Sequence, residues 1–200
     1  MYSNNPFGTW AEAGQGHSSN TVWGGGAPPP SVFGALPYPA ASSNLVTFYF
    51  TSFSPDILNC SIVGPQGQTL YRVVTDNQMP GYTVIKNAEG RNISLIEWQA
   101  HPFIEIRGIL PKQNVRNWLR LSPDRASRTM DVRGMRYMWS PSDKAISLFA
   151  GSASHPTFLS KITRTHGNIT LDMASDALQL GILDTVIAAA LLLQCGRNID

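Results

Sequence analysis

The densest group of charged residues lies in the segment PKQNVRNWLRLSPDRASRTMDVRGMR, which contains only two acidic residues, Asp124 and Asp131. Arginine presents a planar fork of N–H donors that matches the oxygens of a phosphate. A cation close to an anionic leaflet contributes about 1 kcal/mol to binding. The segment therefore predicts recognition of an anionic lipid surface, such as one containing phosphoinositides. Its basic residues are Lys112, Arg116, Arg120, Arg125, Arg128, Arg133 and Arg136.

An aromatic residue joins this candidate site. If the segment VRNWLRL is a strand, side chains two positions apart share a face, and Arg116, Trp118 and Arg120 lie together. Trp118 would then be an interfacial anchor. A second interpretation stays open, because charge runs are usually solvent faces. In that case the arginines pair with Glu97, Glu105 and Asp131.

Residues that could carry catalysis are scattered. The four histidines are isolated, and no pair has the spacing of metal ligands. The chain has no G-x-S-x-G elbow, and the glycines at 24–26 are not followed by the Lys-Ser/Thr of a phosphate loop. We therefore expect no enzyme activity, no cofactor and no metal. The histidines are His17, His101, His155 and His166.

The two cysteines, Cys60 and Cys195, lie in apolar stretches, and we expect them to be buried thiols and not a disulfide framework. The first residues lack the basic and apolar regions of a secretory signal, so we expect a cytoplasmic protein, or one peripheral at membranes. The net charge of +2 is too small to predict a nucleic-acid partner.

Residues 1–43 consist of Gly, Ser, Asn, Pro and Ala with scattered aromatics, and contain a single charged residue, Glu12. Such a composition cannot bury enough apolar surface to offset its chain entropy, so we predict a disordered tail. Its aromatics, which include Trp10 and Trp23, are candidates for docking to protein partners. The plain alternative is a solubilising leader.

Residues 44–200 alternate apolar and polar positions in short runs separated by turns, beginning with LVTFYF, where Val46, Phe48 and Phe50 share a face. Turn residues at 64–67 and 87–90 predict two hairpins. Tyr137 and Trp139 alternate in MRYMWS and are expected in the core. The spacing predicts about twelve antiparallel strands, arranged as a closed barrel or a sandwich.

The pattern then changes to one hydrophobic helix at about 175–195, with Ser175 as N-cap and Gly196 just beyond its end. A helix that is apolar nearly all round suits either the interior of a barrel or a membrane. Asp184, near its middle, costs about 2.5–3.5 kcal/mol in a bilayer, which favours the barrel interior. There, Asp184 must accept hydrogen bonds or lie near the barrel mouth.

This plan resembles the tubby C-terminal-like superfamily, which includes tubby domains, phospholipid scramblases and LURP-one-related proteins, and a fungal family of unknown function assigned to it. The resemblance covers roughly residues 45–196 and rests on ISLIEWQAHPFIEIRG, GMRYMWSPSDKAISLFA and LDMASDALQLGILDTVIAAALLL. It implies a closed barrel of about twelve strands threaded by the terminal helix. Tubby domains bind phosphoinositides and scramblases are calcium-responsive membrane proteins, but no motif carries either activity to this sequence.

Three functions follow as expectations. The first is a non-enzymatic module that binds anionic membrane lipids through the residues from Lys112 to Arg136. The second is a protein-interaction or assembly module that uses the tail. The third is a membrane protein of scramblase type.

Overall fold

The structure, a computed structural model, describes residues 45–76, 81–151, 155–165 and 167–200. The tail that the sequence predicts over residues 1–43 lies outside the described residues. His17 and His166 lie outside them as well.

The described chain forms one antiparallel sheet of thirteen strands in the order β7-β6-β5-β4-β3-β2-β1-β13-β12-β11-β10-β9-β8. Strands that follow one another along the chain are therefore neighbours in the sheet, except β7 and β8, which α2 separates. In addition, β1 pairs with β13, the last strand in sequence. The strands are β1 (Leu45–Thr51), β2 (Cys60–Val63), β3 (Thr69–Thr75), β4 (Tyr82–Asn87), β5 (Asn92–Glu97), β6 (Phe103–Ile106), β7 (Leu110–Asn114), β8 (Arg120–Leu121), β9 (Arg128–Val132), β10 (Met135–Ser142), β11 (Ala145–Ala150), β12 (Thr157–Thr165) and β13 (Asn168–Ala174).

Alternation along each strand decides which side chains enter the core. In β1, Phe48 and Phe50 are buried while Tyr49 faces outward. In β10, Tyr137 and Trp139 are buried, which confirms them as core aromatics. Because successive side chains of a strand point to opposite faces, the inner face of the sheet is apolar along nearly its whole length.

The two hairpins expected from the sequence are confirmed. Gly67 N–H donates to the carbonyl of Gly64 over 3.0 Å, and Gly90 N–H donates to Asn87 over 2.9 Å. Both Gly67 and Gly90 have positive φ, a conformation that costs glycine little.

The C-terminal helix is two helices, α3 (Ser175–Gln179) and α4 (Leu183–Gln194), where the sequence predicts one. Gly181 lies between them at φ 65°, outside the right-handed helical region. Ser175 is the first residue of α3, and its expected place as N-cap is taken by Ala174. Gly196 follows α4 at φ 69°, as expected for the residue beyond a helix end.

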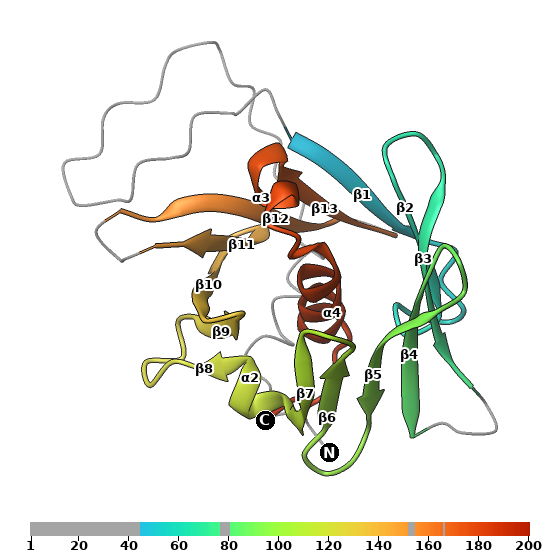
Figure 1. Cartoon of the computed structure of the whole chain (residues 1–200), viewed down its shortest axis with the longest axis horizontal. Helices are drawn as coiled ribbons and strands as arrows, with labels where there is room; N and C mark the ends of the chain where they lie inside the picture. Colours follow the sequence, from blue (N-terminus) through green and yellow to red (C-terminus); the bar gives the residue numbers. More distant parts are fainter. Residues whose placement is uncertain (1–44, 77–80, 152–154, 166) are drawn as a thin grey trace, which may run out of the picture.

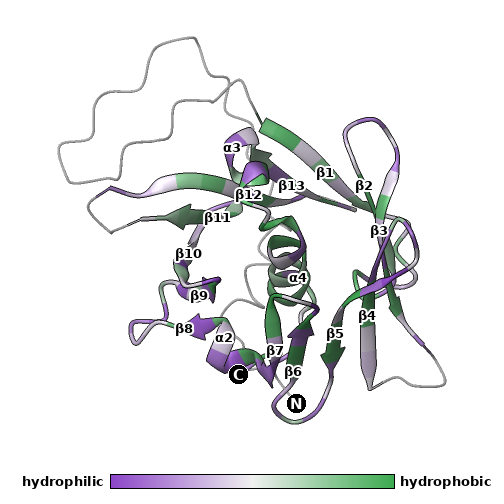
Figure 2. Cartoon of the chain, in the orientation of Figure 1, coloured by the Kyte–Doolittle hydropathy of each residue, from purple (hydrophilic) through white to green (hydrophobic). Residues whose placement is uncertain are grey.

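Helix α4 runs through the middle of the molecule, with the curved sheet around it (Figure 1). It is mainly hydrophobic (Figure 2), and its residues from Thr185 to Gln194 are buried. A helix of this kind is stable in water only if it is enclosed, and the sheet provides the enclosure. This confirms the buried helix. None of the helices in the described part of the chain is long and apolar enough to cross a membrane.

One acidic residue of α4, Asp184, lies in its first turn and accepts a hydrogen bond of 2.7 Å from the hydroxyl of Tyr71 on β3. Burial, followed by this hydrogen bond to the carboxylate, raises the pKa of Tyr71 well above its usual range. The sequence-based expectation that Asp184 accepts a hydrogen bond is thus confirmed.

The sheet has two edge strands, β7 and β8, in place of the closed ladder of about twelve strands expected from the sequence. The chain passes from β7 to β8 through a short helix, α2 (Val115–Trp118), whose Val115 and Trp118 are buried. Beyond α4, Ile199 is fully buried as well.

Candidate anion-binding surface

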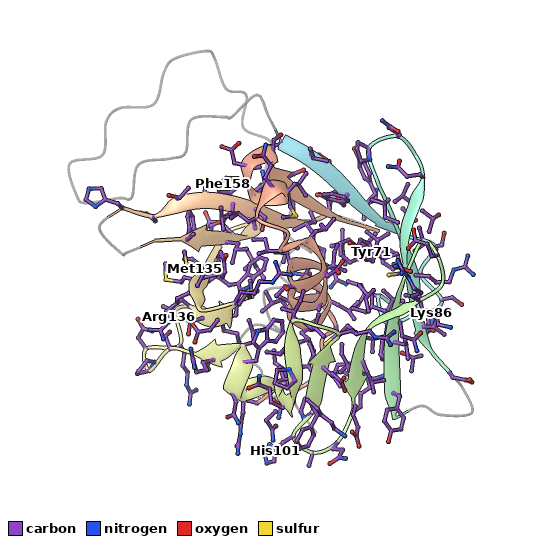
Figure 3. All side chains as sticks on the ribbon, in the orientation of Figure 1. Tyr71, Lys86, His101, Met135, Arg136 and Phe158 are labelled. Carbon is purple, nitrogen blue, oxygen red and sulfur yellow. The ribbon has the colours of Figure 1, made fainter. Side chains whose placement is uncertain are left out.

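The candidate residues lie on consecutive elements from β7 to β10. Six of the eight are exposed, and we call these six the basic face: Lys112 on β7, Arg116 on α2, Arg120 on β8, Arg125 in the β8–β9 turn, Arg133 in the β9–β10 turn and Arg136 on β10. Figure 3 shows Arg136 at the outer side of these strands, pointing away from α4.

Lys112 forms an ion pair of 2.5 Å with Glu97 of β5, and its ammonium lies 5.5 Å from the centre of the Phe103 ring. The bond from Lys112 is the main cause that holds the pKa of Glu97 below its usual range, and the amide of Gln99 contributes next. Glu97 in turn raises the pKa of Lys112. Lys112 is therefore already partnered within the fold.

Asp131 on β9 accepts hydrogen bonds from two arginines. It accepts a hydrogen bond of 3.0 Å from Nε of Arg136, its cross-strand neighbour, and a second bond from Arg120. The bond from Arg136 contributes most to lowering the pKa of Asp131; burial opposes it next, and the bond from Arg120 adds to the lowering. One carboxylate thus neutralises part of the charge of two cations, as the solvent-face interpretation expects.

Arg116, Arg125 and Arg133 form no ion pair with any residue that the structure describes. Arg125 and Arg133 lie in turns at φ 59° and 50°, and both are exposed. The guanidinium of Arg133 lies beside the α3–α4 linker, with Nη1 3.5 Å from the position that a Cβ on Gly181 would take. These three cations carry the uncompensated charge of the basic face.

Arg128 does not belong to this surface, because its side chain is 0% exposed. Its guanidinium donates to both carboxylate oxygens of Asp200, over 2.9 and 2.6 Å, and to the carbonyl of Leu119 over 2.8 Å. A charge removed from water needs such partners. The structure therefore corrects the interpretation of Arg128 from a ligand-binding residue to a structural clamp between β9 and the C-terminal segment.

Trp118 is the second correction. The alternation of VRNWLRL predicts an exposed strand residue, but Val115–Trp118 is helical and Trp118 is 3% exposed. Helical spacing places Trp118 on the same side of α2 as Val115, towards the core, and separates it from Arg116. Trp118 therefore does not reach a membrane as an anchor.

Asp200, which was not among the residues predicted from the sequence, holds Arg128 with its side chain, and its backbone oxygen lies 3.0 Å from Nδ1 of His101. The nearby Arg197 lies 4.6 Å from the centre of the Trp98 ring. The segment that contains Arg197 and Asp200 therefore joins the β5–β6 loop to β9. A buried arginine requires an acidic partner, but no local pattern indicates one so distant in sequence.

The thiols lack the properties of nucleophiles. Burial raises the pKa of Cys60 to about 12, with the charge of Asp56 contributing next, and burial raises the pKa of Cys195 to about 11. Both thiols are therefore protonated at neutral pH. Cys60 is buried, as expected, whereas Cys195 is partly exposed. The described residues also contain no cluster of three His, Cys, Asp or Glu side chains that could hold a metal.

Together, these observations define a class: an antiparallel β protein whose sheet surrounds a C-terminal helix and carries a basic face. The chain belongs to a family of unknown function, DUF6593, which matches residues 55–198. No curated protein matches the sequence. A similar solved structure is that of an Arabidopsis thaliana protein, with 10% identity over 72% of this chain and 89% of that chain, at a TM-score of 0.45.

Proposed function

We propose that this protein is a non-enzymatic module that binds anionic membrane lipids through the basic face. The observation that carries the proposal is that Arg116, Arg125 and Arg133 are exposed without a carboxylate partner in the described chain. All three belong to neighbouring elements between α2 and the β9–β10 turn, where unpaired positive charge is gathered. Phosphate oxygens match the donor geometry of their guanidinium groups.

The strength of this interaction can be bounded. At about 1 kcal/mol per cation, the three unpaired arginines contribute about 3 kcal/mol. Lys112, Arg120 and Arg136 contribute less, because each would have to share its charge with Glu97 or Asp131. A total near 4 kcal/mol corresponds to a dissociation constant on the order of 1 mM. Charge alone therefore supports weak, salt-sensitive and peripheral binding.

The order of strands followed by one buried apolar helix supports a second, structural proposal. We propose that the family is a branch of the tubby C-terminal-like superfamily. We also propose that α2 completes the barrel at the point where β7 and β8 do not pair with each other. Likeness of fold does not transfer the phosphoinositide binding of tubby domains to this chain, so the lipid proposal rests on the basic face.

Reversing the three unpaired charges tests the function. In the variant with Arg116→Glu, Arg125→Glu and Arg133→Glu, we expect cosedimentation with phosphatidylserine vesicles to fall more than about hundredfold in affinity, since at least 3 kcal/mol is lost.

The matched control reverses three exposed cations elsewhere, Arg72, Lys144 and Arg164, and has the same net charge. Equal losses in the two variants would show that net charge and not the basic face attracts the vesicles. An unchanged affinity in the first variant would contradict the proposal.

A further inference from the structure

The outer surface beside the basic face carries an unusual apolar row. On β10, β11 and β12, Met138 pairs with Phe149, and Phe149 pairs with Phe158, all on the face opposite the core. The two rings stack edge to face with their centres 6.1 Å apart. All three side chains are only partly buried. Since Leu148 and Trp139 already fill the inner face of these strands, the fold does not need aromatics on the outer one.

This row is continuous with the basic face. From Met138 the register passes to Thr129 on β9 and from there to Arg120 on β8. Met135, at the start of β10, is 58% exposed, more than the other large hydrophobic side chains that are exposed in the described chain, but strand alternation places it on the opposite face of β10 from Met138. It stands between Arg133 and Arg136 in sequence. Figure 3 shows Phe158, Met135 and Arg136 on one side of the molecule, away from Tyr71 and Lys86.

We propose that an apolar flank made of Met138, Phe149 and Phe158 inserts into the interfacial and upper acyl region of an anionic bilayer, an inference that rests on the proposed lipid-binding function. Aromatic side chains favour the membrane–water interface, and basic side chains beside them reach the headgroups. A partly exposed apolar row that adjoins the basic face fits an anionic bilayer on both counts.

Insertion would also add to the weak binding that the basic face gives by charge alone. Three unpaired arginines alone give weak binding, whereas a few apolar side chains that leave water together strengthen it by one to two orders of magnitude. The combination gives binding that needs anionic lipid for attraction and retains part of its strength when salt screens the charges.

A tryptophan probe reports insertion directly. Phe158→Trp places an indole within the flank, and Tyr49→Trp places one at an exposed position of β1 that pairs with Thr170. Both variants are mixed with vesicles of phosphatidylserine and phosphatidylcholine whose acyl chains carry bromine. We expect bromine to quench the Phe158→Trp variant more than the unsubstituted protein, and the Tyr49→Trp variant no more than it.

Removing the aromatics gives an independent readout. The double variant Phe149→Thr/Phe158→Thr keeps strand-forming residues at both positions, and we expect about tenfold weaker binding to the same vesicles. It should also raise the surface pressure of a phosphatidylserine monolayer less than the unsubstituted protein does. Tyr49→Thr is the matched control and should change neither value.

The outcomes separate this inference from the proposed function. Binding of the unsubstituted protein to anionic vesicles without extra quenching at Phe158→Trp, and with unchanged affinity in the double variant, overturns insertion and leaves charge-driven binding in place. Absence of binding by the unsubstituted protein overturns both. If the double variant does not fold, the quenching of Phe158→Trp alone decides.

Discussion

At the scale of single residues, Arg128 differs most from its neighbours in sequence. Arg125 and Arg133 are exposed, while the side chain of Arg128 lies inside, held by Asp200 and by the carbonyl of Leu119. Alternation explains its direction, because Arg128 shares its face of β9 with the buried Met130 and Val132. A cation in that position is tolerated only with its partners in place.

Substitutions at this clamp should therefore be strongly destabilising. We expect Asp200→Ala to lower the free energy of unfolding by about 3 kcal/mol, since it leaves a buried guanidinium without its carboxylate. Arg128→Met should cost less, because Asp200 is partly exposed and can be hydrated. Urea titrations of both variants and of the double variant measure this.

The double variant should lose less than the sum of the two single losses. Arg125→Met, an exposed arginine three residues away, should change the free energy of unfolding by less than about 0.5 kcal/mol. Additive losses at Arg128 and Asp200 would mean that the two residues do not act as a pair.

At the scale of elements, the break between α3 and α4 depends on Gly181. Its φ of 65° lies in the left-handed region, where a Cβ costs about 1 kcal/mol or more. The resulting turn redirects the chain from the end of the sheet into its interior, so that α4 starts at Leu183 with Asp184 facing Tyr71.

Gly181→Ala should accordingly lower the free energy of unfolding by about 1 kcal/mol. Gly81→Ala is the control, since Gly81 has no positive φ and a Cβ there meets no atom within 4 Å. Thermal unfolding of the two variants gives the comparison. If Gly181→Ala is as stable as the unsubstituted protein, a single continuous helix would be compatible with the fold.

A substitution in the ladder of β8, β9 and β10 should strengthen lipid binding, whereas reversing the unpaired arginines should weaken it. Asp131→Asn removes the carboxylate that Arg120 and Arg136 share, so both become available to lipid phosphates. We expect affinity for phosphatidylserine vesicles to rise about fivefold, which corresponds to about 1 kcal/mol for one added positive charge.

Asp143→Asn in the exposed β10–β11 turn adds the same charge without releasing these arginines, and it should have a smaller effect. Equal gains in the two variants, or a weaker affinity of Asp131→Asn, would contradict the role of the basic face.

The sequence was sufficient to predict those features of the fold that depend only on residues close together in the chain. Alternation in LVTFYF and MRYMWS predicts which side chains enter the core, and the apolar character of the terminal segment predicts an enclosed helix. The same rule failed at VRNWLRL, where helix α2 overrides the alternation and buries Trp118. The alternation in KAISLFA could have indicated that Phe149 faces outward, opposite Leu148.

At the scale of the whole molecule, the features that were missed are contacts between distant parts of the chain. Arg128 and Asp200 are 72 positions apart, and His101 meets the same residue across 99 positions. No pattern in a short window indicates such pairs. The closure of the sheet is also a global property, since it depends on whether β7 and β8 approach each other and not on the strength of any one strand.

The central claim is that one side of this molecule is a surface for anionic membranes. Flotation of the purified protein with phosphatidylserine vesicles, with neutral vesicles as reference and with salt raised from low to high, tests it most directly. We expect flotation with the anionic vesicles only, and we expect it to fall but not vanish at high salt. Equal flotation with neutral vesicles, or none with anionic vesicles at low salt, would contradict it.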